Sequence, residues 1–375
     1  MKKKVCFVVS SAMTVNAFLR EPIRLLSEHY DVYVVLKLNP GESLPDLEGF
    51  AKIFPVRIER KISPWRDFLA ICQMVRLFRR YRFQLVHSVT PKAGLLAMTS
   101  AFLVGVGVRI HTFTGQVWTT RTGFSRWLLK NADRWIGWLS TDVLVDSASQ
   151  CRFLLDEGVL VEAKSGVLAQ GSISGVDTSR FKPDDRARTK IRNELSIPTG
   201  DMVFLYLGRL NRDKGLLDLA SAFAGIDDTG VHLLMVGPDE DRIGPQILTL
   251  AEGNAKRVYF VGFAAKPEEY LAAADVLCLP SYREGFGTVV IEAAAVGIPA
   301  IGSRIYGLVD AIAENESGLL FEVRNVKELR NCMSALCNDK VLRTRLGRQA
   351  RERVLAQFTS EKLALSWLGY YRARL

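Results

Sequence analysis

Short apolar runs alternate with longer segments of helical pattern along this chain, and this alternation most restricts how it can fold. In the first half the runs lie at residues 5–9, 31–36, 85–89, 108–113 and 142–146. In the second half they lie at residues 202–208, 231–237, 257–262, 275–281, 299–303 and 318–321. Strands that are continuously apolar, rather than apolar at alternate positions, are buried on both faces. Such strands occur in parallel sheets covered by helices, so the sequence predicts an α/β protein with two Rossmann-like domains.

The break between the two series is the segment GSISGVDTSRFKPDD, residues 171–185, which is rich in Gly, Ser, Asp and Pro. We place the first domain at residues 1–175, the second at 176–356 and a final helix at 357–375. Domains of this kind bind ligands at the carboxyl ends of their strands and in the cleft between them. Site residues are therefore expected where the apolar runs end.

The composition of the chain indicates in which compartment of the cell the protein is found. The six cysteines are scattered without a CxxC pair, which favours reduced thiols in the cytosol over disulfides or a zinc site. The N-terminal apolar run has only the length of a strand, so we expect no signal peptide. The uncharged run at 93–108 falls short of the ~20 apolar residues of a spanning helix and is interpreted as a buried helix.

A pair of cations follows the first strand of the second domain. Arg209 comes directly after the strand at 202–208, and Lys214 precedes a helical pattern. A guanidinium, an ammonium and a helix N-terminus at one junction suit a diphosphate. Gly208 and Gly237, where the strands at 202–208 and 231–237 end, complete the candidate nucleotide-binding set.

The segment YREGFGTVVIEAAAVGIPAIGSR, residues 282–304, combines an anion site with carboxylates. Its turn, Gly285–Phe286–Gly287, leads into a helix that we expect to begin near Thr288, and helix N-termini bind anions. Glu284 precedes the turn, and Glu292 shares a helix face with Thr288 because the two are four residues apart. Carboxylates do not bind phosphate but accept hydrogen bonds from hydroxyl groups. The ligand that has both parts is a nucleotide sugar.

These motifs resemble family 4 of the retaining glycosyltransferases. EGFGTVVIE is similar to the family's E-x7-E motif, GRLNRDKG to its GR…KG motif, and GVDTSRFKP to its interdomain linker. The similarity spans essentially the whole chain. It implies the GT-B fold, with two Rossmann-like domains facing across a cleft and the last helix crossing back to the first domain. It also implies an enzyme without metal or other cofactor, whose donor substrate is the nucleotide sugar.

The resemblance implies a role for each motif residue. Arg209 and Lys214 would hold the donor diphosphate, and Glu292 the ribose hydroxyls. Glu284 would face the donor sugar near its 3- and 4-hydroxyls. The backbone amides of Phe286, Gly287 and Thr288 would line the sugar phosphate.

The chain departs from the family pattern at two places in its first half. Many relatives have a glycine pair after the first strand, where this chain has SSAMTVN. Many also have a histidine where HTFTG places Thr114, and the nearest histidine here is His111. Either Thr114 or His111 would take that role at the donor sugar. His87 also lies at a strand end, where we expect a structural role as much as a role in the site.

HSVTPKAGLL and HTFTGQVW are similar to the branch of the family that extends undecaprenyl-diphosphate-linked sugars for O-antigen, capsule or protein glycans. The acceptor implied is a lipid-linked saccharide, and the donor a UDP-sugar, with a UDP-N-acetylhexosamine preferred.

No isolated nucleophile faces a general acid, so the sequence favours front-face transfer over a covalent intermediate. A glycoside hydrolase has no need of the Arg209–Lys214 pair. A non-hydrolysing sugar-nucleotide epimerase of the same fold and a non-catalytic nucleotide-sugar-binding protein are the alternatives.

Positive charge is concentrated in the first half, where residues 1–180 hold 24 Lys and Arg against 15 Asp and Glu. Residues 63–84 combine Trp65, Phe68, Leu69, Cys72, Val75 and Phe78 at helical spacing with Arg76, Arg79, Arg80 and Arg82. Residues 123–140 combine Trp127, Trp135 and Trp138 with Arg126, Lys130 and Arg134. Aromatic residues beside cations suit an anionic membrane surface rather than nucleic acid. We therefore expect a cytoplasmic protein bound peripherally to the inner face of the cytoplasmic membrane.

Overall fold

The computed structural model describes residues 2–39, 41–59 and 63–375. The chain divides into two compact units, Met1–Gly175 with Ser360–Leu375, and Val176–Thr359. The return to the first unit follows Thr359, three residues later than the sequence suggested. Phe358 stays with the second unit because its carbonyl accepts from Val176 N at 2.8 Å and its ring lies 5.4 Å from that of Phe286.

The first unit contains a seven-stranded sheet in the order β3-β2-β1-β4-β5-β6-β7, and all its pairs are parallel. Its strands are β1 (Lys4–Val8), β2 (Asp31–Leu36), β3 (Lys52–Pro55), β4 (Leu85–Val89), β5 (Val108–Phe113), β6 (Asp142–Val145) and β7 (Ser165–Val167). The edge strands β3 and β7 had not been predicted, because neither forms a continuously apolar run.

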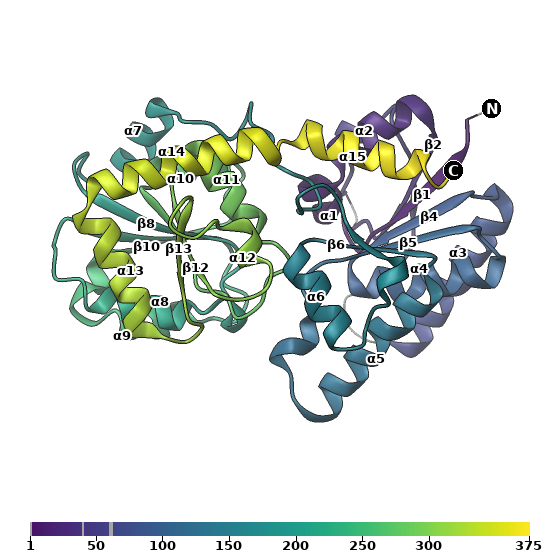
Figure 1. Ribbon diagram of the computed structural model, residues 1–375, viewed down its shortest axis with the longest axis horizontal. Coiled ribbons are helices and arrows are strands. Elements are labelled where there is room, and N and C mark those ends of the chain that lie inside the picture. The colour runs from purple at the N-terminus through teal and green to yellow at the C-terminus, as the bar shows by residue number, and fades with distance from the viewer. Residues whose placement is uncertain (1, 40, 60–62) are drawn as a thin grey trace. The chain divides into compact units, whose positions relative to one another are not determined.

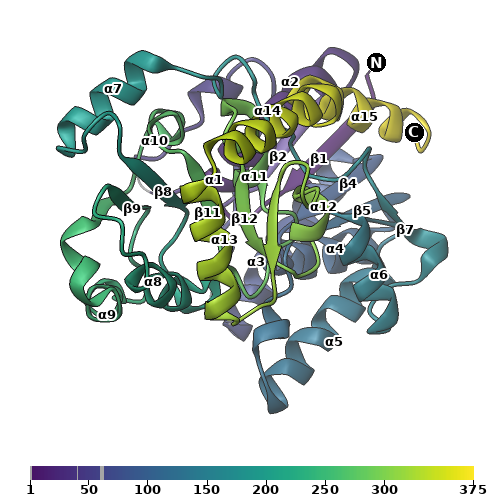
Figure 2. The same cartoon turned by 60° about the vertical axis from the view of Figure 1, so that its left-hand side comes forward.

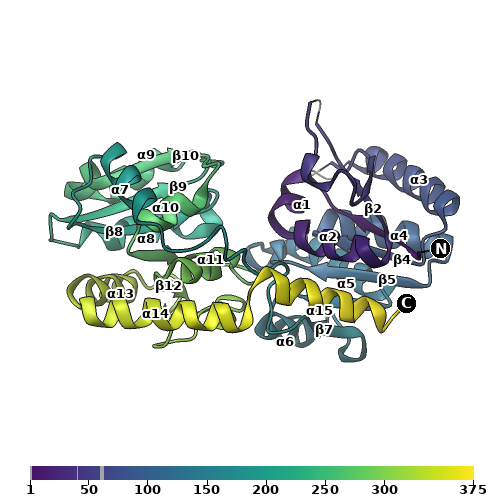
Figure 3. The ribbon, with the colours of Figure 1, turned by 90° about the horizontal axis from the view of Figure 1, so that it is seen from above.

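Helices cover both faces of this sheet (Figures 1 and 3). One apolar core includes residues of α1 (Ala12–Phe18), α2 (Arg20–His29) and α15 (Ser360–Arg372). The other includes residues of α3 (Pro64–Tyr81), α4 (Pro91–Val104), α5 (Gly123–Leu139) and α6 (Ala148–Asp156). The C-terminal helix belongs to this unit, since Trp367 Nε1 donates to Ile173 O at 3.1 Å and Tyr371 Oη lies 2.8 Å from His87 Nδ1.

The second unit contains a six-stranded parallel sheet in the order β10-β9-β8-β11-β12-β13. Its strands are β8 (Met202–Leu207), β9 (Val231–Val236), β10 (Val258–Gly262), β11 (Val276–Leu279), β12 (Ala300–Ser303) and β13 (Gly318–Phe321). Its helices are α7 (Asp185–Glu194), α8 (Leu216–Ala224), α9 (Gly244–Leu250), α10 (Pro267–Ala273), α11 (Thr288–Val296), α12 (Leu308–Ala311), α13 (Val326–Asn338) and α14 (Lys340–Gln357). Among them α11 packs on α14, and α8 on α9 and α13 (Figure 2).

Both sheets share one strand order, in which the chain moves outward on one side of the first strand and then restarts on its other side. The predicted α/β class with two Rossmann-like domains is confirmed. In the second unit the reversal falls between β8 and β11. Ligands of open α/β sheets bind outside the carboxyl ends of the strands at such a point. The segment at 93–108 contributes to helix α4, and no helix among the described residues is long and apolar enough to cross a membrane.

Candidate functional site

The segments that follow β8 and β11 pack against each other at the reversal point of the second sheet. After β8 the chain passes through Arg209 and a 3₁₀ turn, η4 (Arg212–Lys214), to Gly215, which precedes α8. Gly215 has φ +66°, and a Cβ atom there would lie 2.0 Å from the carbonyl oxygen of Pro280, after β11. Only glycine allows this approach. The close contact brings the loops that carry the predicted site residues together.

Four side chains that the sequence analysis missed, those of Asp213, Asp218, Tyr282 and Arg283, hold these loops in place. Tyr282 N donates to Asp213 O at 2.9 Å, and Tyr282 Oη donates to Asp218 Oδ2 at 2.8 Å. Arg283 Nε forms an ion pair with Asp213 Oδ2 at 3.1 Å. The contacts join residues 64 to 70 positions apart in the chain, and no local pattern marks them. They fix the position of Glu284 relative to Lys214.

Lys214 and Glu284 form an ion pair at the centre of this arrangement. Their side chains are only 19% and 15% exposed, and Ser281 Oγ donates to Glu284 Oε1 at 2.8 Å. The sequence analysis assigned Lys214 to phosphate and Glu284 to sugar without relating them. The structure places the cation and the carboxylate in direct contact, so a ligand that binds one must change the surroundings of the other.

Helix α11 begins at Thr288, directly after the turn that the sequence identified. Gly287 caps it with φ +82°, and a Cβ atom there would lie 2.6 Å from Leu308 Cδ2. The ring of Phe286 is buried against Phe358, so only the backbone of Phe286 can reach a ligand. Gly285 is buried as well. The turn therefore presents the N-terminus of a nine-residue helix to the end of the sheet.

Glu292 lies one turn further along α11 and, like Thr288, remains partly exposed while most of the helix is buried. Burial raises the pKa of its carboxyl to about 7, against the attraction of nearby Arg180 and with repulsion from Glu268. Arg180 Nη2 forms an ion pair with Glu268 Oε2 at 2.7 Å. Arg180 is part of the linker-like GVDTSRFKP, but the sequence analysis gave it no role. The neighbourhood suits a carboxyl that gains its charge near neutral pH.

Arg209 extends from the end of β8 and forms an ion pair with Glu240 at 3.0 Å. Tyr206 Oη donates to the carbonyl oxygen of Arg209 at 2.8 Å and fixes the backbone there. A Cβ atom on Gly237 would lie 1.9 Å from Gly208 O. This close approach of the two strand ends explains the need for glycine at Gly237 by packing alone.

His111 and Thr114, the two candidates for the role of the family histidine, differ in their burial within the first unit. The His111 ring is completely buried, with Nδ1 2.8 Å from Ser88 Oγ, and burial lowers its pKa to about 3. A Cβ atom on Gly94 would lie 2.4 Å from the ring, so α4 leaves it no room to move. Thr114 is partly exposed, and its carbonyl oxygen accepts from Gln150 Nε2 at 2.8 Å. A ring without exposed surface cannot touch a donor sugar, which favours Thr114.

His87 is held entirely by neighbours within the first unit. Its Nδ1 lies 2.8 Å from Tyr371 Oη and its Nε2 lies 2.7 Å from Thr112 Oγ1. The ring is buried, and desolvation holds its pKa well below its usual range. Because both ring nitrogens have hydrogen-bond partners, His87 has a structural role.

Two cations, a helix N-terminus and two carboxylates lie at the reversal point of a Rossmann-like sheet, which is the place where α/β proteins of this class bind nucleotides. Residues 187–353 match the family model described as glycosyl transferases group 1. The match covers most of the second unit, and the resemblance to glycosyltransferases drawn from the motifs is confirmed.

Two relatives align with nearly the whole chain. The capsular polysaccharide biosynthesis glycosyltransferase CapM of Staphylococcus aureus is 28% identical over 96% of this chain and 95% of its own. The UDP-Gal:alpha-D-GlcNAc-diphosphoundecaprenol alpha-1,3-galactosyltransferase of Escherichia coli is 24% identical over 90% and 88%. Among solved structures, HepE of Anabaena in complex with UDP-glucose is 18% identical, covers 99% of both chains and has a TM-score of 0.81. The structural similarity confirms the GT-B fold.

Proposed function

We propose that this glycosyltransferase moves a sugar from a UDP-sugar to a hydroxyl group of a lipid-linked saccharide during surface-polysaccharide assembly, with retention of configuration. The observation that carries the proposal is the contact between Lys214 and Glu284, which combines a phosphate-binding cation with a hydroxyl-binding carboxylate. The names of the relatives support the pathway and the acceptor, since one concerns capsule and the other a diphosphoundecaprenol-linked sugar. The UDP-glucose complex of HepE supports the donor.

In this proposal Arg209 and Lys214 bind the two phosphates, and the N-terminus of α11 adds its amides and Thr288. Two cations and a helix N-terminus supply the charge neutralisation that a metal provides in other enzymes, so we propose transfer without a metal or other cofactor. Glu292 accepts hydrogen bonds from the ribose hydroxyls.

Donor binding exchanges ion pairs. Arg209 is paired with Glu240, and Lys214 with Glu284. When the diphosphate takes both cations, the carboxylate of Glu284 becomes an acceptor for hydroxyl groups of the donor sugar. Only a ligand that carries both parts satisfies all these groups, because bare phosphate would leave Glu284 without the partner it has lost.

We propose front-face transfer for the chemical step. The bond between the anomeric carbon and the diphosphate oxygen breaks while the acceptor oxygen bonds to the same face of that carbon. The acceptor proton passes to the departing diphosphate oxygen, which is the nearest base and gains negative charge as the bond breaks. Arg209 and Lys214 stabilise that charge, so the same cations bind the donor and favour its departure.

The test is a donor panel with and without acceptor. The protein is incubated with labelled UDP-glucose, UDP-galactose, UDP-N-acetylglucosamine and UDP-N-acetylgalactosamine, with or without a lipid diphosphate monosaccharide. We expect UDP release from an N-acetylhexosamine donor only when the acceptor is present. Retention should give an equatorial anomeric proton in the product by NMR, as in the donor. Sugar interconversion without acceptor would identify an epimerase, and release to water a hydrolase. Binding without turnover would identify a sensor.

We also propose that the protein works while bound peripherally to the cytoplasmic membrane. Two observations support this location: the lipid-linked acceptor named for one relative, and the positive charge concentrated in the first 180 residues.

A further inference from the structure

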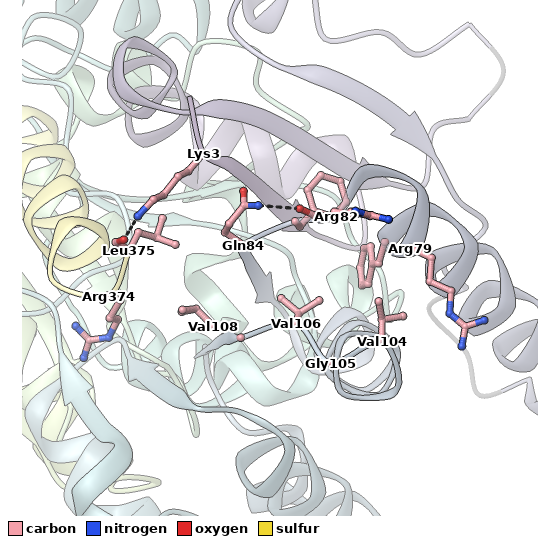
Figure 4. A pocket seen from close by; sticks show the side chains of 13 residues that line it. Lys3, Arg79, Arg82, Gln84, Val104, Gly105, Val106, Val108, Arg374 and Leu375 are labelled. Atoms are coloured by element: carbon pink, nitrogen blue, oxygen red, sulfur yellow. Dashed lines mark hydrogen bonds between the residues drawn. The ribbon is translucent and has the colours of Figure 1, made fainter. Parts of the chain in front are cut away.

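An open hollow of about 760 Å³ lies at the amino-terminal edge of the first unit's sheet (Figure 4). It is bounded by the last turn of α3, by the end of α4 and by the residues that precede β1 and β4. Parallel strands have all their carboxyl ends at the opposite edge, where ligands of such sheets bind. The hollow is therefore separate from any site at those strand ends.

The walls of the hollow combine cations with an apolar floor. Val104, Val106 and Val108 line it on one side, and Arg79 and Arg82 on another (Figure 4). Arg374 also lines the hollow, and its Nε forms an ion pair with Asp142 Oδ1 at 2.6 Å. Within residues 2–39, 41–59 and 63–375, no carboxylate forms an ion pair with Arg79 or Arg82. The hollow therefore suits an anionic group attached to an apolar body.

Exposed aromatic side chains adjoin the hollow. Phe102 and Leu103, which precede the lining residue Val104 in the chain, are 46% and 58% exposed. The Phe102 ring lies 5.5 Å from Trp138 of α5, which lies 5.1 Å from Trp135. Both tryptophans are about half exposed, whereas Ile136 and Leu139 of the same helix are buried. We call Phe102, Leu103, Trp135, Trp138 and the hollow the amino-edge surface.

We propose that the amino-edge surface docks on an anionic lipid bilayer, with its aromatic side chains in the interfacial layer and a headgroup phosphate held in the hollow by Arg79 and Arg82. Tryptophan and phenylalanine beside cations are the composition that suits the headgroup region, and basic residues are attracted to anionic leaflets. A second copy of the chain fits less well. A two-fold contact centred on this surface would place the Arg79 and Arg82 of two copies close together, and their charges would repel each other.

This assignment refines the sequence-based expectation. Phe78, which the sequence grouped with the membrane-facing residues of α3, is buried in the core. Trp65, Phe68 and Leu69 are exposed, but they lie at the other end of α3. The inference rests on the proposed function only in that a lipid-linked acceptor requires contact with a bilayer.

The test measures cosedimentation of the full chain with vesicles of phosphatidylcholine alone or mixed with phosphatidylglycerol. We expect binding to the anionic vesicles that weakens as salt rises. Arg79→Glu with Arg82→Glu should weaken that binding at least about tenfold. Lys256→Glu with Lys327→Glu makes the same change of net charge at exposed positions of the second unit and should leave binding within about twofold of wild type.

The aromatic part has its own test. Trp135→Ser with Trp138→Ser should weaken vesicle binding at least about tenfold, whereas Phe263→Ser, at an exposed position of the second unit, should not. In the wild type, lipids brominated near the headgroup should quench tryptophan emission.

Three outcomes would overturn the inference: no binding to either vesicle, equal loss in both charge-reversal variants, or a dimer without vesicles that the tryptophan changes dissociate. Calorimetry with UDP on the same variants separates this inference from the proposed function. Vesicle binding without any UDP binding would leave the docking surface intact and refute the transferase proposal.

Discussion

The ion pair between Lys214 and Glu284 makes a quantitative prediction about stability. Both side chains are less than one-fifth exposed, and Ser281 Oγ also donates a hydrogen bond to Glu284. A hydrogen bond between charged groups contributes ~1.5–3 kcal/mol, and removing one partner leaves the other charge partly buried. Lys214→Met should therefore destabilise the second unit by about 1.5–3 kcal/mol, which lowers its Tm by roughly 3–12 °C for a domain of this size.

A double-mutant cycle isolates the interaction. Lys214→Met, Glu284→Gln and the double variant are unfolded in urea, and the loss in the double variant should be smaller than the sum of the single losses by at least ~1 kcal/mol. Gln at 284 keeps an acceptor for Ser281, so the cycle reports the charge pair. Additivity within ~0.5 kcal/mol would show that the pair does not form in solution and would refute the reasoning about ion-pair exchange.

The same variants then test ligand binding by calorimetry. Bare UDP should bind the Glu284→Gln variant at least as well as the wild type, because the competitor for Lys214 has been neutralised. The UDP-sugar should bind it more weakly, since its hydroxyls lose a charged acceptor. Equal weakening of both ligands would remove Glu284 from the sugar and place it with the nucleotide.

Three further predictions concern neighbouring residues. Arg209→Ala should reduce transfer at least about tenfold with an unchanged circular dichroism spectrum, and near-normal turnover would take Arg209 out of the site. Burial raises the folded-state pKa of the Glu292 carboxyl to about 7, so the folded state should lose stability as pH rises toward that value. UDP-sugar affinity should increase over the same pH range, because the ribose hydroxyls gain a charged acceptor. Glu292→Gln should weaken both UDP and the UDP-sugar and abolish this pH dependence, so a persisting pH dependence would assign it to another group. Gly215→Ala should cost at least ~2 kcal/mol in urea unfolding because its Cβ meets Pro280 O, and a loss below ~0.5 kcal/mol would contradict the close approach.

The architecture could be predicted from the sequence because burial on both faces leaves a local record. Each of the eleven apolar runs corresponds to a strand, and their two series correspond to the two sheets. The strands that escaped prediction, β3 and β7, are edge strands. An edge strand is less enclosed, so its residues need not be apolar, as in Lys52–Pro55 with its exposed ends.

The candidate site residues could also be predicted, since they follow strand ends and precede a helix N-terminus, and both features are visible along the chain. Arg209 and Lys214 come after one strand, and Glu284, Thr288 and Glu292 after another. What their residue types allow chemically needs no tertiary structure.

Only the tertiary structure decided which of these side chains meet. Lys214 and Glu284 are 70 residues apart and touch because β8 and β11 are neighbours in the sheet, while β9 and β10 lie on the other side. It also buried His111 and left Thr114 partly exposed, although both belong to the same short segment. Residue type and period are local properties of a chain, whereas contact and burial depend on strand order and on the helices that cover the sheet.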